Sequence, residues 1–284
     1  MNNTFDIKRF GFVFRKDLME NWKRYTLLLL TMLGIMAIVF IWPSLEYYSF
    51  FERNGRSYTD LNHNLLAFAS LMFGGFGILF ASTFMNPMNS KTKRGAWLVS
   101  PSSMLEKYLS RWLIVTVGYM IAFFAALWIV DMLRVGLCTA RYPDLEVKFL
   151  DYTKLIVTGD GWKKREYVFE KDLFIIVTSL YFLFQSLFIL GSTFWEKSSF
   201  IKTFTAGAII LLAFVLFCRW TILLSYGDFE HFGNMLNSFE SIEKDTVSKE
   251  QATLFAACVL SVCTLANWIL AFFRLRESEI IKRI

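Results

Sequence analysis

The chain has 284 residues, of which 55% are hydrophobic and 18% aromatic, while only 19% are charged. This composition is too apolar for a soluble domain of that length, so a membrane protein is the first expectation. The net charge is +6, and cations facing the anionic lipid surface account for it. Because no platform of alternating basic and aromatic residues lies outside the apolar runs, nucleic-acid binding is not expected.

The segment from residue 5 to 25, FDIKRFGFVFRKDLMENWKRY, precedes the first apolar run. Phe10, Phe14, Leu18 and Trp22 recur at helical spacing, and lysine and arginine cover most of the remaining surface. This pattern predicts an amphipathic helix that lies in the membrane interface. The alternative is a simple cytoplasmic extension of the first span, but aromatic residues beside cations in ENWKRY favour the interfacial position.

Six apolar runs follow, each close to the length of about 20 residues that a helix needs to cross a bilayer. They lie at residues 26–42, 65–84, 112–130, 173–194, 203–225 and 252–273. The chain is therefore predicted to be an all-α, polytopic membrane protein with one transmembrane domain, residues 1–284. Lysine and arginine concentrate in the segments that an inside N-terminus would place in the cytoplasm. Both termini are accordingly predicted to be cytoplasmic, in a multi-pass membrane protein.

The connector between the second and third runs, residues 86–111, is basic. Its cations are Lys91, Lys93, Arg94, Lys107 and Arg111. Ser103 and Glu106 have the spacing of a capping box, and Pro101 is compatible with a helix start. The third helix should therefore begin near Met104 and project about 10 Å beyond the hydrocarbon. The positive-inside rule explains the cations, but it does not explain a capped helix start so far from the membrane.

The connector between the third and fourth runs, residues 131–172, is the largest external segment. Two strand-like stretches flank the turn sequence TGDG at residues 158–161, which predicts a small external β-hairpin. Asp131 and Arg134 are three residues apart at the start of this connector. A local pair that caps the third helix is the simplest expectation for them.

Three polar side chains lie within the apolar runs. Gln185 and Asn267 would lose hydrogen bonds if they faced lipid, so we expect them to point into the protein, and interhelical bonding is favoured over a lined pathway. Arg219 is the sole charge inside a run, and it either lines a pathway or extends to the outer interface about 9 Å away. Neither catalytic residues nor a metal site can be recognised from a motif, so no enzyme is expected.

The order of these parts resembles a type-2 ABC transporter permease. The segment SPSSMLEKYLSR at residues 100–111 is similar to the stretch that follows the first cytoplasmic loop in that family. Residues 82–94 and the tail FFRLRESEIIKRI also resemble bacterial permease-like membrane proteins. The external connector of residues 131–172 is a departure from the family, and it removes any basis for assigning roles to external loops.

The resemblance implies an exporter in which two permeases, as a homodimer or a heterodimer, pair around a pathway in the lipid bilayer of the inner membrane. Separate ATP-binding-cassette ATPase subunits would bind the ATP, while this chain binds no cofactor. The first cytoplasmic loop would transmit ATPase closure, with a second contact at residues 195–202. The implied coupling residues are Lys91, Lys93, Arg94, Pro101, Ser103, Glu106, Lys107, Arg111, Glu196 and Lys197. A second hypothesis is a non-transporting scaffold or sensor with an external ligand-binding loop and a basic cytoplasmic recruitment face.

Overall fold

The computed structural model describes residues 5–54, 61–85, 95, 97, 100–156, 168–195, 198–226 and 249–281. In these ranges six helices are long and apolar enough to cross a membrane, so the protein is a polytopic helical membrane protein. Their elements are α1 (Ile7–Asn54), α2 (Leu61–Ala81), α4 (Met104–Leu113) joined through η2 (Ile114–Gly118) to α5 (Tyr119–Arg141), α6 (Lys171–Phe194), α7 (Ser199–Tyr226) and α9 (Lys249–Ile281).

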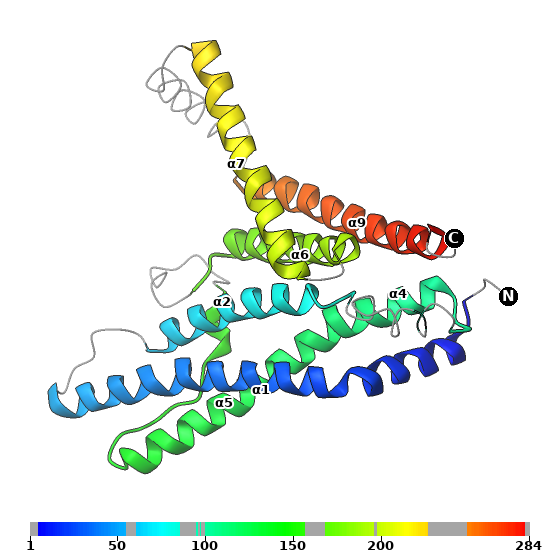
Figure 1. Cartoon of the computed structure of the whole chain (residues 1–284). Helices are drawn as coiled ribbons and strands as arrows, with labels where there is room; N and C mark the ends of the chain where they lie inside the picture. The colour runs from blue at the N-terminus through cyan, green and yellow to red at the C-terminus, as the bar shows by residue number, and fades with distance from the viewer. Residues whose placement is uncertain are drawn as a thin grey trace.

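The helices form two groups, as Figure 1 shows. One group consists of α1, α2 and the continuous α4–η2–α5 helix, and the other consists of α6 packed along α9. Contacts between α2 and α6 join the two groups. The helix α7 crosses α6 and then projects away from the other helices (Figure 1). The start of α1 and the end of α9 lie at the same end of the bundle, which we call the termini end (Figure 1).

The first span belongs to a much longer helix than the sequence predicted. α1 runs without a break from Ile7 to Asn54, so the prediction of a separate interfacial helix over residues 5–25 is wrong. At 1.5 Å per residue a helix of 48 residues is about 72 Å long, more than twice the thickness of the hydrocarbon. Pro43 lies inside α1, and the next residue, Ser44, donates its hydroxyl hydrogen to the Phe40 carbonyl at 2.7 Å.

The third span begins where the sequence predicted. α4 starts at Met104, and Ser103 and Glu106 form both hydrogen bonds of a capping box. The helix continues to Arg141, eleven residues beyond the predicted end of the span. Its turn from Ile114 to Gly118 is π-helical, so this turn holds more residues than an α-helical one.

The external connector forms no β-strand in the part that the structure describes. The predicted turn at residues 158–161 lies outside the described residues, and Ile156 and Phe169 on its two sides make one isolated bridge. Residues Tyr152–Leu155 form a short 3-10 helix instead, which the Asp151 side chain caps. The N–H and hydroxyl of Thr153 both donate to this carboxylate, and its pKa is therefore lowered.

Asp131 and Arg134 pair as predicted, at 2.7 Å, but they do not cap the helix end. Both side chains are buried, and α5 continues past them to Arg141. The Leu150 N–H donates to the Asp131 carboxylate at 2.9 Å, and Arg134 donates to the Lys148 carbonyl at 2.8 Å. The pair therefore holds the external connector against α5.

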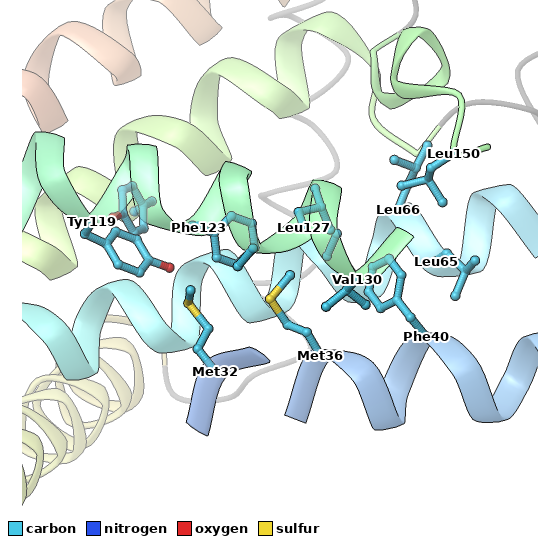
Figure 2. Packing of buried hydrophobic residues seen from close by; sticks show 13 residues of the cluster. Met32, Met36, Phe40, Leu65, Leu66, Tyr119, Phe123, Leu127, Val130 and Leu150 are labelled. Carbon is cyan, nitrogen blue, oxygen red and sulfur yellow. The ribbon is translucent and has the colours of Figure 1, made fainter. Parts of the chain in front are cut away.

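Two large apolar clusters fill the described bundle, and a third, small cluster comprises Tyr48, Cys138 and Tyr142. One large cluster lies on the side of the external connector, and we call it the connector-side cluster. Figure 2 shows its residues Met32, Met36 and Phe40 of α1, which point toward a row of α5 side chains that includes Tyr119 and Phe123. The termini-side cluster comprises Ala81, Phe84, Met85, Trp97, Tyr108, Val115, Phe188, Ile189, Ala271 and Leu275. These buried contacts fix α2, α5 and α6 relative to one another.

Candidate functional site

The strongest concentration of buried charge in the described chain lies at the termini end, between α1 and α4. It consists of two ion pairs, Arg9 with Glu106 and Asp17 with Arg111, and we call these four residues the α1–α4 ion-pair cluster. Eight residues separate the two members on α1, and five separate the two on α4. From the termini end inward, α1 carries a positive and then a negative residue, whereas α4 carries a negative and then a positive one. Only one relative position of the two helices along their axes therefore brings unlike charges together.

The first pair is built on the capping box of α4. The Glu106 carboxylate accepts the Ser103 N–H at 3.0 Å and the Asp6 N–H at 2.9 Å. Arg9 adds a two-pronged contact, with Nε 2.8 Å from Oε2 and Nη2 2.7 Å from Oε1. Such bidentate, charge-assisted hydrogen bonds are the strongest class in proteins. The Glu106 side chain is fully buried, while that of Arg9 is 30% exposed.

These hydrogen bonds decide the protonation state of Glu106. Three charged residues lie between positions 104 and 111, so this part of the helix belongs outside the hydrocarbon. Burial acts to raise the pKa of the Glu106 carboxyl, but the hydrogen bonds from Arg9, Asp6 and Ser103 outweigh it and lower the pKa to about 2. The carboxylate is therefore ionised at neutral pH.

The second pair lies one and a half turns nearer the bundle. Arg111 Nη2 is 3.0 Å from Asp17 Oδ1, and the Ser110 hydroxyl donates to Oδ2 of the same carboxylate at 2.9 Å. Arg111 Nη1 also donates to the Phe84 carbonyl at 2.9 Å, just after the end of α2. Both charged side chains are only 4% exposed. This pair consequently ties α1, α4 and the end of α2 into one unit.

An aromatic layer covers the other side of α4. Lys107 Nζ lies 5.2 Å from the centre of the Trp97 ring, and the Arg111 guanidinium carbon lies 5.8 Å from it, which are cation–π distances. The Tyr108 hydroxyl donates to the Trp268 carbonyl of α9 at 2.9 Å. Through these contacts α4 is held by α9 as well as by α1.

The structure places the predicted coupling residues in three different settings. Glu106, Lys107 and Arg111 are buried inside the protein, so they do not form an exposed docking surface. Pro101 is exposed and Ser103 is partly exposed beside the start of α4. The remaining predicted coupling residues, which lie outside the described residues, are Lys91, Lys93, Arg94, Glu196 and Lys197.

Sequence reasoning missed Arg9 and Asp17, the α1 half of the cluster. Arg9 was assigned to the charged surface of an interfacial helix, and Asp17, which is 3% exposed, was given no role. Asp17 is one of three acids, with Asp6 and Glu20, on a segment rich in cations, so no local signal distinguished it.

The polar residues predicted within the spans also separate. Asn267 Nδ2 donates to the Ser186 hydroxyl at 3.0 Å, an interhelical hydrogen bond between α9 and α6. Gln185 is fully buried, and neither amide atom has a hydrogen-bond partner in the described structure. Arg219 lies with an exposed side chain on α7, the helix whose apolar stretch is not buried by the rest of the chain.

A cavity at the opposite end of the bundle has room for a small molecule. It has a volume of about 390 Å³ and lies between the C-terminal part of α1, the start of α2 and the connector of residues 131–172. Tyr47, Tyr48 and Phe149 supply aromatic walls, and the charged lining residues are Arg134, Glu146 and Lys148. Lys148 Nζ lies 3.4 Å from Glu146 Oε2, so the lining carries both signs of charge. Aromatic walls with a few polar groups are typical of small-molecule sites.

No family model, curated protein or solved structure matches the chain.

Proposed function

We propose that the chain is the membrane-spanning permease subunit of an ATP-driven exporter, of the type-2 ABC permease kind. Two permeases would pair, and a separate ATP-binding-cassette ATPase would dock at the termini end on the cytoplasmic side. The observation that carries this proposal is the α1–α4 ion-pair cluster, because it converts the termini ends of two spans into one stiff projection.

A coupling element must transmit force from a docked subunit to the spans. α1 and the α4–α5 helix each continue from this projection into the membrane without a loop. The buried pairs Arg9–Glu106 and Asp17–Arg111 prevent the two helices from sliding past one another. A displacement applied to the start of α4 would therefore reach the bundle core instead of being absorbed locally.

The ATPase would contact the exposed face of this projection and not the buried charges. Leu105 is 46% exposed in the first turn of α4, and Pro101 is exposed just before it. Phe12 of α1 is 72% exposed at the same end. An apolar surface flanked by positive charges suits a protein partner.

The experiment is to purify the tagged chain in a mild detergent from membranes of its native host and measure ATP hydrolysis by the purified complex. Leu105→Asp is expected to abolish the co-purifying ATPase activity while the protein still elutes as a folded species. Leu137→Asp is the matched control, because Leu137 is 50% exposed on the outer part of α5 and lies on the other side of the membrane. If the wild type carries no ATPase, or if Leu105→Asp retains it, the proposal fails.

The outer cavity favours a second candidate function, a membrane sensor or scaffold whose external connector binds a small ligand. Lys148 and Phe149 line the cavity from the connector, and Arg134 lines it from α5. ATP-dependent transport by proteoliposomes that contain the purified complex would argue against this candidate. A thermal stabilisation by a small aromatic compound, lost in Phe149→Ala, would support it.

A further inference from the structure

A layer of polar side chains separates the two large apolar clusters inside the bundle. Thr116 lies between Val115 of the termini-side cluster and Tyr119 of the connector-side cluster. On α6, Gln185 lies between Tyr181 of the connector-side cluster and Phe188 of the termini-side cluster. Thr116 is 4% exposed and Gln185 is fully buried.

The two residues belong to the same layer because of how their neighbours pack. Tyr119 and Tyr181 both contact the ring of Phe73 on α2, with ring centres 5.6 and 4.6 Å from it. Thr116 lies about one helical turn before Tyr119, and Gln185 lies about one turn after Tyr181 on α6. Because the two helices run in opposite directions, both residues are displaced from the Phe73 ring toward the termini end. They consequently occupy the same level of the bundle.

Neither side chain is satisfied by the described protein. The Thr116 hydroxyl and both amide atoms of Gln185 are buried and have no hydrogen-bond partner. A buried amide or hydroxyl without a partner costs about 1 to 3 kcal/mol. Because Gln185 has no exposed surface, neither lipid nor a second protein chain can reach it, and only a small molecule held inside the bundle can supply the bonds.

We propose that Thr116 and Gln185 bind water inside the membrane bundle. The Gln185 amide offers donors and an acceptor, and the Thr116 hydroxyl offers both, which meets the requirement of two or more polar partners for a buried water. The Tyr181 hydroxyl, buried and also without a partner in the described structure, lies beside Gly77 of α2. Gly77 is one turn from Phe73 toward the termini end, so this hydroxyl adds a third polar group near the same level. The bundle is thus hydrated at a level flanked on both sides by apolar packing.

A double-substitution cycle distinguishes a hydrated site from a dry one. If water bridges the two side chains, Gln185→Leu and Thr116→Val should each lower the apparent thermal midpoint by a few degrees. The double variant should lose less than the sum, because replacing both partners leaves nothing unpaired. If the site is dry, each single substitution should raise the midpoint and the two effects should add, which would overturn the proposal.

Thr264→Val is the matched control. Thr264 is also 4% exposed, but its hydroxyl already donates to the Leu260 carbonyl of its own helix at 2.9 Å. Its substitution should therefore show no coupling to Gln185→Leu. Coupling as large as that of Thr116→Val would mean that the cycle reports general packing, and it would count against the water site.

A direct measurement keeps the proposal testable even if a variant fails to fold. The sequence contains two glutamines, Gln185 and Gln251, so protein labelled with ¹⁵N only at glutamine gives two side-chain amide signals. Gln251 is exposed near the start of α9 and provides the hydrated reference. In liposomes, solid-state NMR should detect magnetisation transfer from water to both amides. Transfer to Gln251 alone would refute a water site at Gln185.

Discussion

The substitution Glu106→Gln tests whether the α1–α4 ion-pair cluster holds the projection together. It removes the negative charge and keeps the shape of the side chain, so it weakens the contact with Arg9 and the capping of α4 at once. Deleting one partner of a buried ion pair costs about 3 to 5 kcal/mol. Since the Arg9 side chain is 30% exposed and water can partly solvate it, the expected loss is nearer to about 2 or 3 kcal/mol.

Equilibrium unfolding in mixed micelles, with an increasing fraction of denaturing detergent, gives the free energy of unfolding for each variant. Glu20→Gln is the matched control, because Glu20 pairs with Lys16 at 3.6 Å while both side chains are about half exposed. An exposed pair of this kind contributes less than about 0.5 kcal/mol. If Glu106→Gln costs no more than Glu20→Gln, the cluster does not stabilise the fold and the argument for a stiff projection fails.

Two further predictions follow from single contacts. The pKa of Glu106 is about 2 in the folded state, and its ordinary value is 4.5. The ionised carboxylate should therefore contribute fully to the free energy of unfolding above about pH 4.5, and this contribution should be lost as the pH falls toward about 2. The stability difference between wild type and Glu106→Gln, measured at a series of pH values, should shrink over that range and stay constant from about pH 6 to pH 8. At Gly77 an added methyl carbon would lie 2.6 Å from the Tyr181 hydroxyl oxygen, so Gly77→Ala should lower the free energy of unfolding by about 1 to 3 kcal/mol. Gly74→Ala, where nothing lies within 4 Å, should not destabilise, and equal losses at both glycines would contradict this.

The features that were predicted correctly from the sequence depend on residues that lie close together in the chain. A run of apolar residues reports a span directly, and the three-residue spacing of Ser103 and Glu106 reports a capped helix start, because both partners of each interaction are close in the chain. The pairing of Asp131 with Arg134 is of the same kind. Such features are readable without knowledge of the fold.

What the sequence did not predict depends on residues far apart. Glu106 is buried because Arg9, 97 positions earlier, reaches it, and no local pattern encodes that contact. The same holds for Asp17 and Arg111, 94 positions apart. Because the distant partner of Arg9 could not be recognised, this charged residue was assigned to the surface. The continuous helix α1 was divided into two segments at the point where its composition changes.

The π-helical turn of the third span determines how the side chains before the turn are rotated about the helix axis relative to those after it. An α-helix advances about 100° per residue, so one additional residue in a turn rotates everything beyond it by roughly that angle. Arg111, held by α1 at the termini end, lies before the turn, and Asp131, which holds the connector, lies after it. Migration of the π-helical turn along this helix would rotate the intervening residues about the helix axis while both anchored ends keep their partners. Such a migration would turn part of the surface of the third span from one neighbour to another without breaking either ion pair.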